Sequence, residues 1–267
     1  MMRALAAEFG KLKHSRMPLW TALAVLGYEA INLALMPVMK DPATVAKMAS
    51  AGGGFGKALA TGMYAPTWEN FLRFGAQGIS GAWGLYLFGL AAAYLFGRES
   101  REGTAGTMLT LPVRREYFVV AKMTVLAVWA LGLTLLSSVL HVGVVALIGA
   151  DGFAWAHVAK SLADTLTVAL LVYLTMPLVA WFALLGRGYL PPMLFCVAMN
   201  MTGMALVQTS DLSSYFPWSM PVNFIGASWM PVPPSPLVAG SWAVAAVCFA
   251  AGLALVMWRA DRVDAAR

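Results

Sequence analysis

Six apolar stretches, each long enough to cross a lipid bilayer, dominate this chain. The hydrocarbon core of a membrane is about 30 Å thick and takes about 20 apolar residues of helix. With 60% hydrophobic residues and a mean hydropathy of +0.73, the chain is too apolar for a soluble surface to cover it. We therefore predict an all-α integral membrane protein with one transmembrane domain over residues 1–267. The six predicted spans are 17–39, 79–97, 123–149, 162–185, 189–208 and 237–258.

The distribution of Lys and Arg predicts the orientation of these spans. Cytosolic flanks of membrane proteins carry an excess of basic residues. Thirteen of the 18 basic residues lie before the first span, at 98–122, at Arg187 or after the last span, and five lie in the alternate segments. We therefore expect both termini to be cytosolic. The net charge of +6 follows from this asymmetry and does not indicate nucleic-acid binding.

The N-terminal segment 1–16 carries an amphipathic pattern. Leu5, Phe9 and Leu12 recur at helical spacing, and most of the basic residues fall on other faces. One interpretation is an amphipathic helix on the cytosolic membrane surface. The other is a plain basic flank that anchors the first span.

Two further segments outside the spans have distinct compositions. Residues 66–78 place aromatic and apolar side chains on one helical side, which favours an interfacial helix leading into the second span. Residues 209–236 are rich in aromatics and contain six prolines, so they cannot form a continuous helix. With almost no charge, this outer loop is expected to pack against the bundle or dip into the outer leaflet.

No motif for bond chemistry is present in the sequence. The glycine-rich segment AGGGFGKA at 51–58 lacks a phosphate loop's first Gly, where Ala51 stands, and its Ser or Thr, where Ala58 stands. The HExxH and GxSxG signatures are absent, and three histidines have no metal-ligand spacing. Cys196 and Cys248 lie inside apolar stretches and are interpreted as small core residues. We therefore predict a protein that is not itself catalytic and binds no metal or other cofactor.

Glu29 and Asp164 are ionisable residues inside predicted spans. A carboxylate at mid-bilayer costs about 2.5–3.5 kcal/mol, so each needs a polar partner, a wet cavity or a proton. For Glu29, with Asn32 one turn away, a substrate cavity and a structural hydrogen bond are both open. Asp164 lies near the end of its span, where solvation is the ordinary explanation. Asn200, Thr202 and His141 are interpreted as hydrogen-bonding residues between helices.

The segment 98–122 is a dense cluster of charge between two apolar spans, and its pattern is specific. It resembles the cytosolic loop of the ABC-2 family of ABC-transporter permeases, in which an Arg-Glu pair, Glu-Gly-Thr, a Leu-Thr-Leu-Pro-Val-Arg stretch and Ala-Lys follow one another. The resemblance covers about 25 residues closely and the six-span chain more loosely, and it favours the subgroup associated with bacitracin and lantibiotic immunity. The matching residues are Arg98, Glu99, Glu102, Gly103, Thr104, Leu109, Leu111, Pro112, Arg114, Ala121 and Lys122.

This resemblance implies that residues 98–110 form a short coupling helix docked in a groove of a separate ATPase subunit. Glu99 and Glu102 would pair with basic groups of that partner, and Pro112 fits the first turn of the next helix. The alternative is that these charges only hold the spans in position. The expected ATPase-coupling residues are Arg98, Glu99, Arg101, Glu102, Gly103, Thr104, Pro112 and Arg114.

The resemblance also implies the partners. We expect two copies of a cytosolic ABC ATPase that use ATP and Mg²⁺, and a second permease, identical or different, in a bacterial cytoplasmic membrane. The expected activity is export of an amphipathic or hydrophobic substrate, with a peptide antibiotic as one candidate. Glu29, Asn32, Asn200 and Trp218 are candidates for the substrate path. The alternatives are a membrane scaffold and an ATP-independent secondary transporter or channel, although the two related halves common in secondary transporters are not visible.

Overall fold

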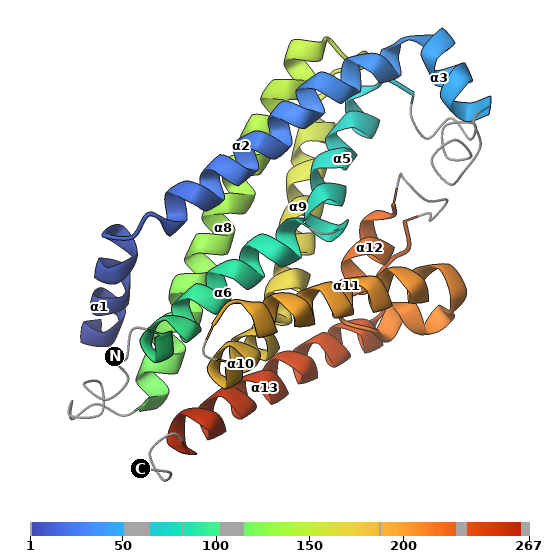
Figure 1. Cartoon of the computed structure of the whole chain (residues 1–267). Helices are drawn as coiled ribbons and strands as arrows, with labels where there is room; N and C mark the ends of the chain where they lie inside the picture. Colours follow the sequence, from blue (N-terminus) through green and yellow to red (C-terminus); the bar gives the residue numbers. More distant parts are fainter. Residues whose placement is uncertain are drawn as a thin grey trace.

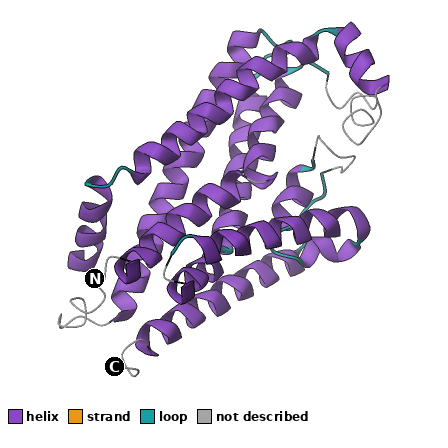
Figure 2. Cartoon of the chain, viewed as in Figure 1, coloured by secondary structure: helices purple, strands orange, loops and turns teal. Residues whose placement is uncertain are grey.

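The computed structural model describes residues 2–50, 65–81, 83–101, 115–186, 188–227 and 234–262. These residues form helices joined by turns, and no strand is present among them (Figures 1 and 2). The predicted all-α class is therefore confirmed.

Within the described residues, five helical segments are long and apolar enough to cross a membrane. They are Met17–Lys40, Glu116–Ile148, Trp155–Leu185, Leu190–Thr209 and Ala239–Ala260. A sixth candidate is a bent pair, Trp68–Gly81 and Trp83–Glu99, whose axes meet at 43°. The described residues therefore contain the six predicted spans if this bent pair is counted as one broken span. The corresponding elements are α2 (Met17–Leu35) with η1 (Met36–Lys40), α5 (Trp68–Gly81) with α6 (Trp83–Arg101), α8 (Arg115–Ile148), α9 (Trp155–Leu174) with α10 (Met176–Gly186), α11 (Leu190–Thr209) and α13 (Ala239–Arg262).

Helix α5 differs from the predicted interfacial helix, because it lies inside the bundle. Phe71, Leu72, Ala76 and Ile79 are buried, and α5 packs along α9 with further contacts to α6 and α8 (Figure 1). The same apolar face that suggested a membrane surface is covered by other helices. Counted with α6 as one broken span, the second span therefore begins at Trp68, eleven residues before the predicted start.

The predicted fourth span is divided into α9 and α10 at Thr175. Pro177 has no backbone N–H for the helix ladder, and the Thr175 hydroxyl donates to the Val172 carbonyl at 2.8 Å. Helix α9 also begins at Trp155, seven residues before the predicted start.

The described helices share one large apolar core and several smaller ones, and the large core and one smaller core matter here. The large core joins α6, α8, α9 and α10 through side chains such as Phe88, Leu126, Val172 and Val179. The smaller core lies where η1, α5 and the end of α8 meet, and its members are Met36, Trp68, Phe71, Leu72, Val144 and Val145. Many large apolar side chains of α2, α8 and α11 remain exposed. An outer surface of this kind fits a lipid environment.

Helix α1 (Met2–Lys13) confirms the predicted N-terminal helix, and its apolar face contacts protein. Leu5, Phe9 and Leu12 pack against the large core, and α1 lies along α8. In Figure 1 both chain termini, the last turn of α6 and the first turn of α8 lie at one end of the bundle. Helix α3 (Pro42–Ser50) lies at the other end.

The proline-rich outer loop forms two short helices instead of a continuous one, as predicted. These are η2 (Asp211–Tyr215) and α12 (Met220–Ile225), and α12 packs against α5 and α9. Met220, Pro221 and Val222 are buried there. The part of this loop within the described residues therefore folds onto the bundle.

Candidate transport path and coupling surface

Glu29 lies at the centre of a buried polar cluster that joins three helices. Its side chain on α2 is almost fully buried and contacts two residues of α8. Glu29 Oε2 lies 2.7 Å from His141 Nδ1, and Oε1 accepts a hydrogen bond of 3.0 Å from Ser137 Oγ. Asn32 Nδ2 lies 3.4 Å from Oε2, and His141 Nε2 lies 2.9 Å from the Phe71 carbonyl of α5. Ser137 and His141 share one face of α8 because they are four residues apart.

The hydrogen bonds of His141 indicate how many protons the Glu29 and His141 side chains share. The Phe71 carbonyl can only accept, so His141 Nε2 must carry a hydrogen and donate it. The contact between Nδ1 and Glu29 then needs one further proton, held either by the imidazole or by the carboxyl group. Both arrangements make the pair neutral overall. The contacts with His141 and Ser137 offset part of the cost of burying Glu29 among apolar helices.

Two glycines allow α5 to approach this cluster closely. A Cβ atom on Gly75 would lie 2.8 Å from His141 Cδ2, and one on Gly78 would overlap the Tyr28 hydroxyl. The Tyr28 hydroxyl donates to the Phe74 carbonyl at 3.2 Å, which gives α2 a second link to α5. The α2–α5–α8 contact therefore depends on small residues as well as on the Glu29–His141 contact.

Asn200 and Trp218, the other two path candidates, meet at the break between α5 and α6. The Asn200 side-chain amide donates to the Gly81 carbonyl, which ends α5. Trp218 packs edge-on against Phe195 of α11, with ring centroids 5.5 Å apart. Both residues line a small hollow together with Ser80. The four predicted path residues thus form two pairs on different parts of the bundle.

Asp164 pairs with a residue of its own helix. Lys160 Nζ lies 2.7 Å from Asp164 Oδ2, one turn away on α9, and Lys160 is well exposed. Because α9 begins at Trp155, Asp164 lies nine residues inside the span and not near its end, and Lys160 is its charge partner there.

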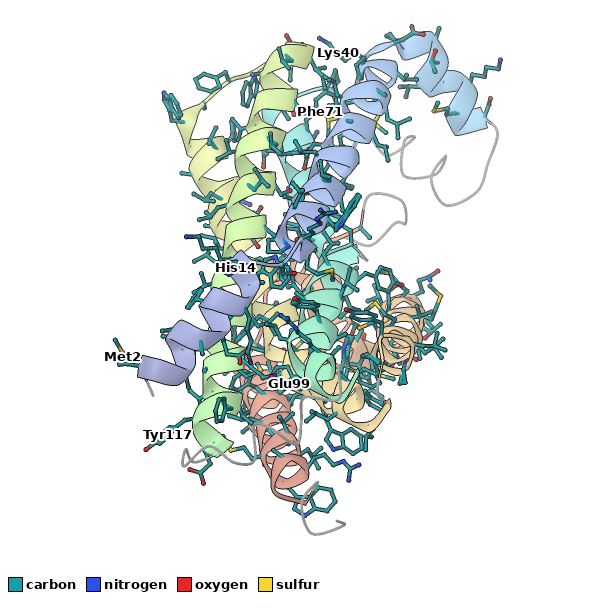
Figure 3. The ribbon with its side chains drawn as sticks, turned by 60° about the vertical axis from the view of Figure 1, so that its left-hand side comes forward. Met2, His14, Lys40, Phe71, Glu99 and Tyr117 are labelled. Carbon is teal, nitrogen blue, oxygen red and sulfur yellow. The ribbon has the colours of Figure 1, made fainter. Side chains whose placement is uncertain are left out.

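A second charged cluster, the basal network, lies at the end of the bundle that holds both termini. It consists of Glu8, Lys11, Glu99 and Lys122. Lys122 of α8 is buried and donates 2.5 Å hydrogen bonds to Glu99 Oε2 and to the Leu95 carbonyl of α6. Lys11 of α1 lies 2.5 Å from Glu8 and 3.3 Å from Glu99. The network therefore fastens α1, α6 and α8 together; Figure 3 labels Glu99 in this region.

The predicted coupling segment is described only at its start. Residues 98–101 continue helix α6 and do not begin a separate helix, which corrects the expected boundary at 98. Glu99 has partners within its own chain, and Arg98 donates to the Tyr94 hydroxyl at 3.0 Å while its guanidinium lies over the Tyr94 ring. The side chain of Arg101 is outside the described part of the structure. So are all atoms of Glu102, Gly103, Thr104, Pro112 and Arg114, and their coupling roles stay predictions.

Sequence reasoning assigned His141 a helix-packing role but did not find its partner, and it missed Glu8, Lys11 and Ser137. Thr134, Ser137 and His141 lie three and four residues apart, a polar stripe within an apolar span that could have located the face of α8 opposite Glu29. No comparable signal linked Lys11 to Glu99. Among the residues that the structure describes, no group of His, Cys, Asp and Glu has the arrangement of a metal site.

Comparison with known proteins places these features in a family. Residues 4–203 match the family described as ABC-2 family transporter protein. The bacitracin transport permease protein BCRB of Bacillus licheniformis is 32% identical over 138 residues, which are 51% of this chain and 65% of that protein. The match thus spans less than two thirds of that relative. No solved structure gives a significant match. The family match covers three quarters of the chain, including the polar cluster of α2 and α8 and the basal network, and the chain therefore belongs to the ABC-2 family of transporter proteins.

Proposed function

We propose that this multi-pass membrane protein is the permease subunit of an ABC transporter. In this proposal it associates with two copies of a cytosolic ABC ATPase and with a second permease in a bacterial cytoplasmic membrane. ATP hydrolysis in the partner drives export of an amphipathic or hydrophobic substrate. The ABC-2 match over residues 4–203 carries the proposal, because it includes the charged segment between α6 and α8. The likeness to a bacitracin transport permease makes a peptide antibiotic the first substrate to test.

The arrangement of the helix ends supports an ATPase on one side. Both termini, the end of α6 and the start of α8 lie at the same end of the bundle (Figure 1). The predicted cytosolic segments adjoin helix ends on this side of the bundle. Together they carry thirteen of the 18 basic residues. An ATPase in the cytosol would thus meet the ends of several spans at once.

The basal network provides a route from the partner to the spans. When the ATPase pair closes on ATP, it would displace the segment between α6 and α8. Lys122 and Glu99 hold these two helices together, and Lys11 extends the contact to α1. A displacement of the segment would therefore reach α1, α6 and α8 together. The chain performs no bond chemistry in this scheme.

Co-purification with the ATPase tests the coupling role. Glu102→Arg combined with Arg114→Glu reverses two charges in the predicted docking segment and leaves the basal network intact. We expect this variant to lose most of the bound ATPase and most of its ATP-dependent transport of bacitracin in proteoliposomes. Lys47→Glu is the matched control, since Lys47 is exposed on α3 at the opposite end of the bundle. If the double variant retains both complex and transport, the coupling role is wrong.

One observation favours a second candidate, a secondary transporter that needs no ATPase. The buried Glu29–His141 pair resembles the intramembrane ionisable groups that relay protons in such proteins. A direct comparison separates the two: uptake into vesicles with an imposed proton gradient and no ATP, against uptake with ATPase and ATP and no gradient. Substrate accumulation in the first condition alone would replace the ABC scheme.

A further inference from the structure

A groove of about 220 Å³ lies between α5, α8 and α9, directly beside the Glu29–His141 pair. Leu72 and Gly75 contribute from α5, Val139 and Val142 from α8, and Leu162 from α9. The volume is several times that of a water molecule in the liquid. The groove is therefore large enough for part of a ligand.

Four of the five polar side chains that line this groove, all except Thr165, are engaged with protein. Ser137 donates to Glu29, Ser138 to the Thr134 carbonyl at 2.9 Å, and Ser161 to the Leu72 carbonyl at 3.3 Å. His141 uses both ring nitrogens in hydrogen bonds to other residues. Water in the groove would find few partners, and sites of this kind favour apolar occupants.

The groove opens sideways, between two candidate spans. Val139 and Leu162 at its edge are 71% and 38% exposed. Val139 is nine residues from the end of α8 at Ile148, which places it roughly 13 Å along the axis from that end. Both α8 and α9 are candidate membrane spans, so an opening between their exposed apolar side chains suits the surrounding lipid.

We propose that this groove is a binding site for one acyl chain of a bilayer phospholipid. The chain would enter between α8 and α9 and pack on the ring of His141, which forms the inner wall. The ring is confined on its other sides by Glu29 and by the close approach of Gly75. An acyl chain fills the one open direction, so it holds His141 in contact with Glu29. A membrane lipid thereby stabilises the joint between α2 and the α5–α8–α9 group.

Photolabelling of the full chain in phosphatidylcholine vesicles tests this site. A small fraction of the lipid carries a diazirine on one acyl chain, and labelled peptides are quantified by mass spectrometry after irradiation. We expect residues 137–142 and 158–165 to be labelled several-fold more than Leu194, Val197 and Met201, which are exposed on α11. Equal labelling of both regions would mean ordinary contact with bulk lipid and would overturn the proposal.

A groove-filling variant sharpens the experiment. Ser138→Phe places a ring in the groove and should lower labelling of both groove peptides several-fold while labelling of α11 stays unchanged. Leu135→Phe, one turn earlier and exposed on the same helix outside the groove, is the matched control and should leave all labelling unchanged. The α11 signal reports whether the variant is folded. Undiminished groove labelling in Ser138→Phe with normal α11 labelling would also overturn the site.

Discussion

At the scale of single residues, the contact between Glu29 and His141 explains how a carboxyl group is accommodated in an apolar span. The two residues are 112 positions apart, and the pair is completed by Ser137 and by the Phe71 carbonyl. Removing one member of a buried pair leaves the other without compensation and costs more than the pair itself contributes.

Graded substitutions at Glu29 test the pair. Glu29→Ala leaves the His141 Nδ1 group without a partner and should lower the free energy of unfolding by about 3 kcal/mol. Glu29→Gln preserves shape and hydrogen bonding without charge, and should cost about 1 kcal/mol. Thermal and denaturant unfolding in lipid–detergent micelles measures both. Equal losses would mean that packing, not the polar contact, explains the effect.

Substitutions of His141 separate its two contacts. The amide nitrogen of His141→Asn can replace Nδ1 at Glu29, whereas that of His141→Gln can replace Nε2 at the Phe71 carbonyl. Because the carboxyl group is the costlier one to leave unpaired, we expect His141→Asn to be the more stable variant in the same unfolding assay. The reverse order would show that the link to α5 is the dominant one.

The close approach at Gly75 supports a further stability test. Gly75→Ala puts a methyl group 2.8 Å from the His141 ring, and overpacking of this kind costs about 1–3 kcal/mol. Gly143→Ala is the control, since nothing lies within 4 Å of a Cβ at that position of α8. The control should be neutral or slightly stabilising because Ala favours helix. A neutral Gly75→Ala would indicate that α5 can shift away freely.

At the scale of helices, the basal network gives Glu99 partners within its own chain. Its carboxylate contacts Lys122 of α8 and Lys11 of α1, and its contact with an ATPase stays a prediction. Lys122 is buried, so without the Glu99 carboxylate its charge would have neither water nor a counter-ion. A surface lysine would be solvated instead. The network thus defines how α1, α6 and α8 meet.

A double-mutant cycle measures the link between α6 and α8. Glu99→Gln leaves Lys122 as a buried, unpaired cation and should lower the free energy of unfolding by about 2–4 kcal/mol. Adding Lys122→Met removes that cation and should recover much of the loss. The comparison pair, Lys160 and Asp164, is exposed on one side, and its cycle should give less than about 1 kcal/mol of coupling. Strict additivity at Glu99 and Lys122 would contradict the network.

At the scale of the whole molecule, the structure predicts which residues share a side of the membrane. With Cys196 and Cys248 replaced by Ala, Lys13→Cys reports on the end that holds both termini, and Ala43→Cys on the opposite end. A membrane-impermeant maleimide should label Ala43→Cys in intact cells and Lys13→Cys only after the membrane is opened. Ala245→Cys is buried and should react in neither state. The opposite labelling pattern would invert the proposed orientation.

The membrane class, the approximate spans, the N-terminal helix and the family resemblance all follow from the amino-acid sequence alone. These are local properties, since apolar length, helical periodicity and a run of charges are all contained within a few turns of chain. The predictions failed where an apolar pattern did not reveal whether lipid or another helix covers it. The apolar face of α5 would suit either a membrane surface or a helix bundle, and only its packing along α9 decided between them.

The partners of the buried polar residues, in contrast, depend on how the helices pack. Glu29 was recognisable as an anomaly, but its partner His141 lies 112 positions away. Lys11 and Glu99 are 88 positions apart, and Asn200 and Gly81 are 119 apart. A polar residue within an apolar span is visible in the local sequence, because its burial is costly wherever the span lies. The partner that offsets this cost depends on which helix faces pack together.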